Sequence, residues 1–220
     1  MENQKSDPNL RRDILAELKW DPSVADEEIA VAVKDGVVTL GGFVQTYAHK
    51  LAAERAVKRV EGVRAISEQL EVRLPSSHSR NDTDLAHQVV DALKWDVEVP
   101  DEKIKAKVEN GWVTLEGMVD WHYQRDAAER AVRYISGVKG ISNAIALTPQ
   151  VKEKDVTKLI KEALRRHAER EASRVRVVTD GGTVTLEGRV DSWAERSEIE
   201  QAAWSARGVT KVEDRLLVGL

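Results

Sequence analysis

The amino-acid sequence repeats itself, and this repetition constrains the fold more than any local pattern does. Residues 10–72 align with residues 85–147 without a gap, and 26 of the 63 positions are identical. A further shift of 71 residues places residues 184–188 on 113–117 and residues 208–209 on 137–138, so a third, more diverged copy follows. A copy of this size is near the lower limit for a domain with a core of its own. We therefore predict three small tandem domains rather than one large core.

Short polar segments separate the three copies. The segments PSSHSRNDT, residues 75–83, and PQVKEK, residues 149–154, are poor in large apolar side chains. We predict that they are linkers and that the domains span residues 1–74, 84–148 and 155–220.

Each copy presents the same succession of hydrophobic periods. It opens with apolar residues at helical spacing, as at Leu10, Ile14 and Leu18. A strand of period two follows, as in residues 104–108, and leads into Asp-Gly, Asn-Gly or Asp-Gly-Gly, which are residues of tight hairpin turns. A second strand, an alanine-rich helix as in residues 52–57, and a last strand complete the copy. This order predicts an α+β fold of three tandem αββαβ two-layer domains, each a three-stranded sheet with two helices on one face.

Glycine recurs at three kinds of position in the copies. We expect the turn glycines to take positive φ, the strand glycines to let a helix backbone approach closely, and a third set to end the second helices. In that order they are Gly36, Gly111 and Gly182; Gly42, Gly117 and Gly188; and Gly62, Gly137 and Gly208.

Composition excludes several classes of function. The chain has no Cys, so it forms no disulfide and no cysteine-ligated metal site. Its 34 basic and 38 acidic residues give a net charge of -4, which argues against a nucleic-acid binder that depends on a broad basic surface. No apolar run is long enough for a transmembrane helix. The sequence opens without a signal peptide, so we expect a cytoplasmic protein, and a periplasmic one only if the sequence is a trimmed mature form.

No motif in the sequence predicts catalysis, a metal or a cofactor. The five His have no metal-ligand spacing and do not recur at equivalent positions, which indicates surface or linker residues. Phosphate-binding loops and nucleophile elbows are absent. Glu54 and Glu129 recur in the copies, but each precedes a basic residue by four positions, which predicts ion pairs on a helix surface. We therefore expect a protein that is not an enzyme.

Six Trp stand out beside one Phe and three Tyr. Trp20 and Trp95 follow the first helix of their copies, where we expect them to pack over the helix end and the sheet. Trp112 has the parity opposite to the buried positions of its strand, which places it on the sheet face without helices. Trp121 and Trp193 lead into the second helices. Because an indole suits a membrane interface, Trp112, Trp121 and Trp193 are candidate ligand or lipid contacts, with contact between repeats as the alternative.

The repeated unit resembles the BON domain family. The signature Val-Thr-Leu-x-Gly-x-Val occupies residues 38–44, 113–119 and 184–190, after a hairpin turn and before an alanine-rich helix, and Gly-Val precedes the last strand. The resemblance covers nearly the whole chain and implies a non-catalytic binding module. Members of the family are associated with phospholipid surfaces, with protection against osmotic or envelope stress and, in some cases, with potassium sensing.

We weigh three hypotheses for function, of which the resemblance favours the first. The first is stress-related association with phospholipid head groups. The second is a cytoplasmic ligand- or potassium-responsive module, and the third is a protein–protein scaffold or chaperone-like protein.

The acidic loop within residues 96–102, like its counterpart in residues 21–28, lacks the calcium-loop pattern, so we predict turn polarity there rather than an ion site.

Overall fold

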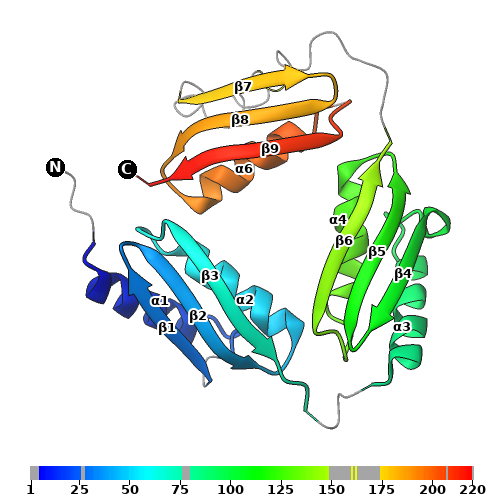
Figure 1. Ribbon diagram of the computed structural model, residues 1–220, viewed down its shortest axis with the longest axis horizontal. Helices are drawn as coiled ribbons and strands as arrows, with labels where there is room; N and C mark the ends of the chain where they lie inside the picture. The colour runs from blue at the N-terminus through cyan, green and yellow to red at the C-terminus, as the bar shows by residue number, and fades with distance from the viewer. Residues whose placement is uncertain are drawn as a thin grey trace. The chain divides into compact units, whose positions relative to one another are not determined.

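The internal repetition appears in the computed structural model as three sheets of three strands each (Figure 1). The structure describes residues 5–25, 28–75, 80–148, 160, 162, 174–206 and 208–219. The predicted α+β fold with tandem repeats is confirmed. Residues 76–79 of the first predicted linker, His78 among them, lie outside the described residues, and so do the second predicted linker and His167. Helix α3 begins at Asp82, inside the segment predicted to be the first linker.

The first repeat contains the complete predicted order of elements. They are α1 (Asp7–Trp20), β1 (Ile29–Lys34), β2 (Val37–Val44), α2 (Tyr47–Arg59) and β3 (Ala65–Val72). Strand β2 is central, antiparallel to β1 and parallel to β3.

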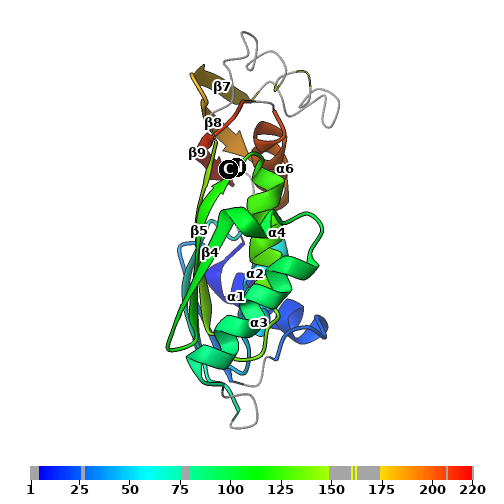
Figure 2. The same ribbon diagram turned by 90° about the vertical axis from the view of Figure 1, so that its right-hand side faces the viewer.

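The second repeat follows the same order with a short 3-10 helix before its first strand. Its elements are α3 (Asp82–Trp95), η2 (Asp101–Lys103), β4 (Ile104–Glu109), β5 (Trp112–Val119), α4 (His122–Val132) and β6 (Gly140–Leu147). In Figure 2, α3 and α4 lie on the same side of the sheet, as predicted.

The third repeat is described from its first strand onward. Its elements are β7 (Val175–Asp180), β8 (Thr183–Val190), α6 (Trp193–Trp204) and β9 (Lys211–Val218). Before β7 the structure describes Ile160 and Glu162, both helical, and Ile160 is buried in the core of this repeat.

Small side chains let the second helix of each complete repeat approach its sheet. In α2 the buried residues are Ala52, Ala53, Ala56 and Val57, and they face a sheet whose inner side is lined by larger aliphatic residues such as Leu40. The larger residues of α1 fill the rest of the core. Alternation of buried and exposed positions along β2 leaves the other face of the sheet without a helix.

The hairpin between the first two strands is tied to the start of the first helix. The Asp7 carboxylate accepts the backbone N–H groups of Asp35 and Gly36 at 2.9 and 3.1 Å. Asp82 accepts those of Asn110 and Gly111 in the same way, at 2.6 and 2.9 Å. Asp35 and Asn110 both take φ of 52°, and each is followed by a glycine with positive φ, as the hairpin prediction requires. In the third hairpin the positive φ falls on Gly181 rather than on the predicted Gly182.

The strand glycines face a different neighbour from the one predicted. A Cβ at Gly42 would collide with the backbone carbonyl of Glu28, at the start of the neighbouring strand, and the φ of Gly42 is 108°. Gly117 and Gly188 meet the equivalent carbonyls of Lys103 and Arg174. The close approach therefore comes from the adjacent strand of the hairpin and not from a helix.

The glycines predicted to end the second helices lie beyond the helix ends. Helices α2, α4 and α6 end at Arg59, Val132 and Trp204. Gly62, Gly137 and Gly208 take positive φ in the turns that lead to the last strands.

Candidate binding surface

Two tryptophans at equivalent positions are the most exposed aromatic residues in the described part of the chain. Trp20 is the last residue of α1 and is 83% exposed, and Trp95 is the last residue of α3 and is 86% exposed. The expectation that they pack over the sheet was wrong. The physical reason is helical geometry: Trp20 lies two residues, or about 200°, beyond the buried Leu18, so it points away from the core.

The turn after each tryptophan is built in the same way in both repeats. The Asp21 carboxylate accepts the N–H of Ser23 at 3.0 Å, and the N–H of Val24 donates to the Asp21 carbonyl at 3.0 Å. Val24 is buried, so it anchors the turn in the core. Turns of this kind, with Asp accepting from the residue two positions on, fix the backbone locally.

The second repeat reproduces this turn with different side chains. Asp96 accepts the N–H of Glu98 at 2.9 Å, and the N–H of Val99 donates to the Asp96 carbonyl at 3.1 Å. Val99, like Val24, is buried. The motif Trp-Asp-x-x-Val therefore presents an exposed indole next to a constrained turn, once in each of the first two repeats.

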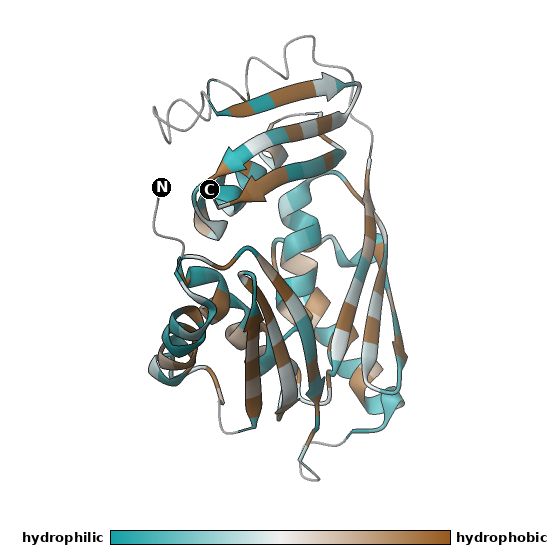
Figure 3. Ribbon diagram, turned by 60° about the vertical axis from the view of Figure 1, so that its left-hand side comes forward, coloured by the Kyte–Doolittle hydropathy of each residue, from teal (hydrophilic) through white to brown (hydrophobic). Residues whose placement is uncertain are grey.

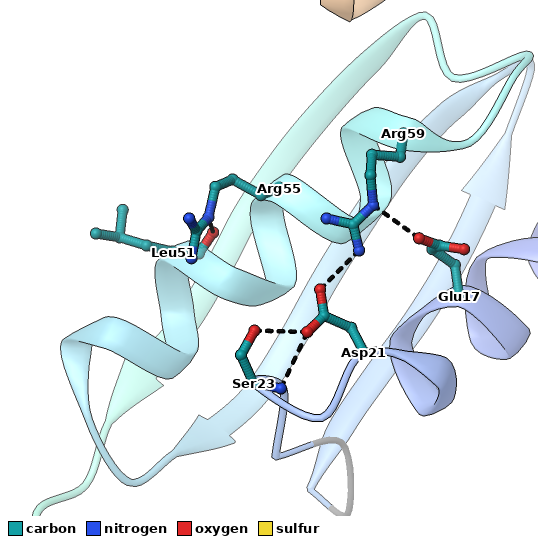
Figure 4. Close-up of polar contacts among 6 residues, drawn as sticks. All are labelled: Glu17, Asp21, Ser23, Leu51, Arg55 and Arg59. Carbon is teal, nitrogen blue, oxygen red and sulfur yellow. Dashed lines mark hydrogen bonds and ion pairs between the residues drawn. The ribbon is translucent and has the colours of Figure 1, made fainter.

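In the first repeat, Arg59 ties this turn to the second helix (Figure 4). Its guanidinium donates to the carboxylate of Glu17 at 2.7 Å and to that of Asp21 at 2.7 Å. The Ser23 hydroxyl also donates to Asp21, at 2.6 Å. The pKa of the Asp21 carboxyl falls to about 2, first because of the Ser23 hydroxyl and then because of Arg59. The same two carboxylates raise the pKa of Arg59.

In the second repeat, a different arginine makes the equivalent bridge. Arg130, one turn earlier in its helix than the equivalent of Arg59, binds the carboxylate of Glu98 at 2.6 Å. The position of Arg59 is taken by Tyr134, which is 67% exposed, and Val97 is 99% exposed. The second repeat therefore exposes three apolar or aromatic side chains, Trp95, Val97 and Tyr134. They stand at the positions that Trp20, Pro22 and Arg59 have in the first repeat.

The third repeat does not carry the motif. At the shift of 71 residues that aligns it with the second repeat, Arg166 stands where Trp95 does. Residue 166 lies outside the described residues.

Of the three tryptophans predicted as contacts, Trp112 is the most exposed. It lies on the helix-free face of β5, which confirms the predicted parity, and its indole lies over Gly140 of the neighbouring strand. Trp121 is half-buried before α4. Trp193 is half-buried at the start of α6, with the Arg196 guanidinium carbon 5.0 Å from the ring centroid. A role for these three in ligand or lipid contact stays a prediction.

The two recurring glutamates singled out by sequence pair with basic residues of their own helices. Glu54 pairs with Lys58 at 2.7 Å and Glu129 pairs with Arg133 at 3.2 Å, which confirms the predicted ion pairs.

Within the ranges that the structure covers, no group of three or more metal-ligating side chains is gathered. Among the helices described, none is long and apolar enough to cross a membrane.

One known domain family matches the chain three times. The family model described as BON domain matches residues 6–73, 81–149 and 152–219. Osmotically-inducible protein Y of Escherichia coli (strain K12) is 32% identical over 145 residues, which cover 64% of this chain and 72% of that protein. A solved structure of the C-terminal domain of CdsD, a structural protein of the type III secretion system of Chlamydia trachomatis, matches 98% of this chain and 100% of that one. Its sequence identity is 15% and its TM-score is 0.27.

Proposed function

This chain belongs to the BON domain family, and on that premise we propose that it is a stress-related, non-catalytic protein that binds anionic phospholipid surfaces through Trp20 and Trp95. The family membership and the osmotic induction named for its relative support the stress-related part. One observation carries the lipid part: two equivalent helix ends hold an indole almost fully in water.

The chemistry of the indole favours a membrane interface as the partner. Its ring is apolar while its N–H is a hydrogen-bond donor, so Trp prefers the boundary between head groups and acyl chains. A lysine precedes each tryptophan, and both Lys19 and Lys94 are exposed. A cation beside each indole gains from the negative potential of an anionic leaflet.

The constrained turns lower the cost of presenting the indole. Because Asp21 and Asp96 fix the backbone just after Trp20 and Trp95, less backbone freedom is lost when the indole binds. Trp112, Trp121 and Trp193 remain second candidates, because each is less exposed than Trp20 and Trp95.

Co-sedimentation with vesicles of graded anionic lipid content tests the proposal. Binding by the wild-type chain should rise with the anionic fraction and fall with salt. The double variant Trp20→Ala with Trp95→Ala should lose most of this binding, while Trp112→Ala, which removes a second candidate on the sheet face, should keep it. Binding that is unchanged in the double variant but lost in Trp112→Ala would move the contact to the sheet of the second repeat.

The same samples separate the alternative functions. If no vesicle binds and K⁺ raises the melting temperature more than Na⁺ does, the ion-responsive hypothesis replaces this one. If neither lipid nor cation has an effect, the scaffold hypothesis replaces it.

A further inference from the structure

The three sheets have six edge strands. On five of them, exposed basic side chains or a side chain bonded to a backbone N–H discourage pairing with another chain, whereas on β1 Arg11 covers one carbonyl. An edge strand exposes backbone N–H and C=O groups, which form a template for a further strand unless charge or a covering group prevents it. The edges are β1 and β3, β4 and β6, and β7 and β9.

Side chains cap the last strand of each repeat at the same position. The Glu68 carboxylate accepts the N–H of Leu70 at 2.5 Å, and the Lys50 ammonium donates to the Leu70 carbonyl at 2.8 Å. Asn143 accepts the N–H of Ile145 at 3.3 Å, and Asp214 accepts that of Leu216 at 2.9 Å. These backbone groups are therefore occupied.

The first strands differ from one another in charge. Strand β4 exposes Lys105 and Lys107, and β7 exposes Arg176. At the positions of the two lysines, β1 exposes Ala30 and Ala32. In Figure 3, β1 is coloured hydrophobic along most of its length. Among the three first strands, β1 is therefore the one with no charged residue at the positions of Lys105 and Lys107.

Alternation along the hairpin shows which groups of β1 face outward. The N–H of Phe43, in β2, donates to the carbonyl of Glu28, just before β1, at 3.2 Å. Because the direction of the backbone groups alternates along an antiparallel strand, the N–H and C=O groups of the even-numbered residues 28–34 point toward β2. The odd-numbered residues Ile29, Val31 and Val33 therefore direct their N–H and C=O groups to the free edge. Arg11 of α1 confirms this direction, because its Nε–H donates to the Val31 carbonyl at 2.9 Å.

We propose that the outer edge of β1 pairs antiparallel with β1 of a second copy of this chain, and that Arg11 competes for that edge. A two-fold axis at Val31 gives a self-complementary contact, as closed dimers require. In this register Ile29 pairs with Val33 of the second copy, so all the outward groups of the three odd residues are bonded. The result is one continuous six-stranded sheet.

Opposite charges on β1 and on the residue before it favour pairing with a second copy of this chain in this register. The axis at Val31 places Lys34 opposite Glu28 of the second copy, and the pair occurs twice in the dimer. Both side chains are exposed in the single chain and lie on the same face. Opposite charges directly across a ladder stabilise it, whereas like charges destabilise it. The same arrangement on β4 would set Lys105 against Lys107 of the second copy.

Sedimentation equilibrium across a wide range of concentration tests the pairing. Arg11→Ala frees the Val31 carbonyl of both copies and should lower the dimer Kd at least about tenfold relative to the wild-type chain, since two hydrogen bonds to a charged group, one in each copy, no longer compete. Arg12→Ala is the matched control, because Arg12 lies on the same helix and pairs with the neighbouring Asp13, not with β1. That control should leave the Kd unchanged.

A charge swap then tests the register. In the Arg11→Ala background, Lys34→Glu should raise the Kd about tenfold, since it replaces two attractive pairs by two repulsive ones. Adding Glu28→Lys should restore the Kd. Circular dichroism checks that each variant is folded. A monomeric Arg11→Ala chain at every concentration, or a swap that does not restore the dimer, would overturn the proposal.

Discussion

Leu18 and Trp20 lie two residues apart in α1 and face opposite sides of the helix. Leu18 is 1% exposed whereas Trp20 extends into solvent, and the pair Leu93 and Trp95 repeats the arrangement in α3. The position of the indole therefore follows from the helix period and from the buried leucine that precedes it.

This relationship predicts stability effects of very different size for two neighbouring substitutions. Trp20→Ala should change the free energy of unfolding by less than about 0.5 kcal/mol, because the side chain buries little surface. Leu18→Ala should cost about 2 to 5 kcal/mol, because it leaves a cavity in the core. Urea denaturation of the two variants measures the difference. A Trp20→Ala chain as unstable as Leu18→Ala would show that the indole packs in solution.

The Asp21 carboxyl should titrate near pH 2. Its folded-state pKa lies below its unfolded value, so the stability from its hydrogen bonds is present above about pH 4 and is lost as pH falls toward 2. Ser23→Ala and Arg59→Ala should each raise this pKa, because each removes a donor. Carboxyl chemical shifts measured by NMR against pH give the value, and an unchanged pKa in both variants would contradict the contacts drawn in Figure 4.

The Asp7 carboxylate should protect the first hairpin turn from exchange with solvent. Asp7→Ala leaves the N–H groups of Asp35 and Gly36 without an acceptor, which should weaken the turn by about 1 to 3 kcal/mol. Amide hydrogen exchange should therefore speed up at Gly36. Asn9→Ala, in the same helical turn, is the control and should leave the exchange rate at Gly36 as it is.

Two adjacent glycines in β2 should respond differently to the same substitution. Gly42→Ala forces a Cβ against the Glu28 carbonyl at positive φ, so it should destabilise the first repeat by about 2 kcal/mol or more. Gly41→Ala meets no atom within 4 Å, and it should be neutral or slightly stabilising. Thermal denaturation compares them, and equal melting temperatures would contradict the strand contact.

Sequence predicts those parts of the fold that depend on local periods. The buried faces of α1 and α3, the hairpin turns at Asp35 and Asn110, and the parity of Trp112 follow from spacing alone. The exposure of Trp20 was also available from spacing, since the helix period separates it from Leu18. Its place at the end of the helix had suggested that Trp20 packs over the sheet. Its angle around the helix axis, about 200° from Leu18, instead points the indole into solvent.

Contacts between distant residues could not be predicted from these patterns. Arg59 reaches Glu17 and Asp21 across about 40 residues of chain, and Arg11 reaches Val31 from another element. Such bonds depend on how helix and sheet pack, which hydrophobic periods do not specify. The second repeat shows this directly, because it bridges the same turn from Arg130 and not from the position of Arg59.

Quenching of tryptophan emission by brominated lipid tests the lipid-binding account most directly. Bromine on the acyl chains of anionic vesicles quenches indoles that lie within the interface. We predict strong quenching of the wild-type chain, and little quenching of the variant Trp20→Phe with Trp95→Phe, in which four other tryptophans report. Equal quenching of the two chains, or none in either at high anionic fraction, would contradict the assignment of Trp20 and Trp95 as the lipid contacts.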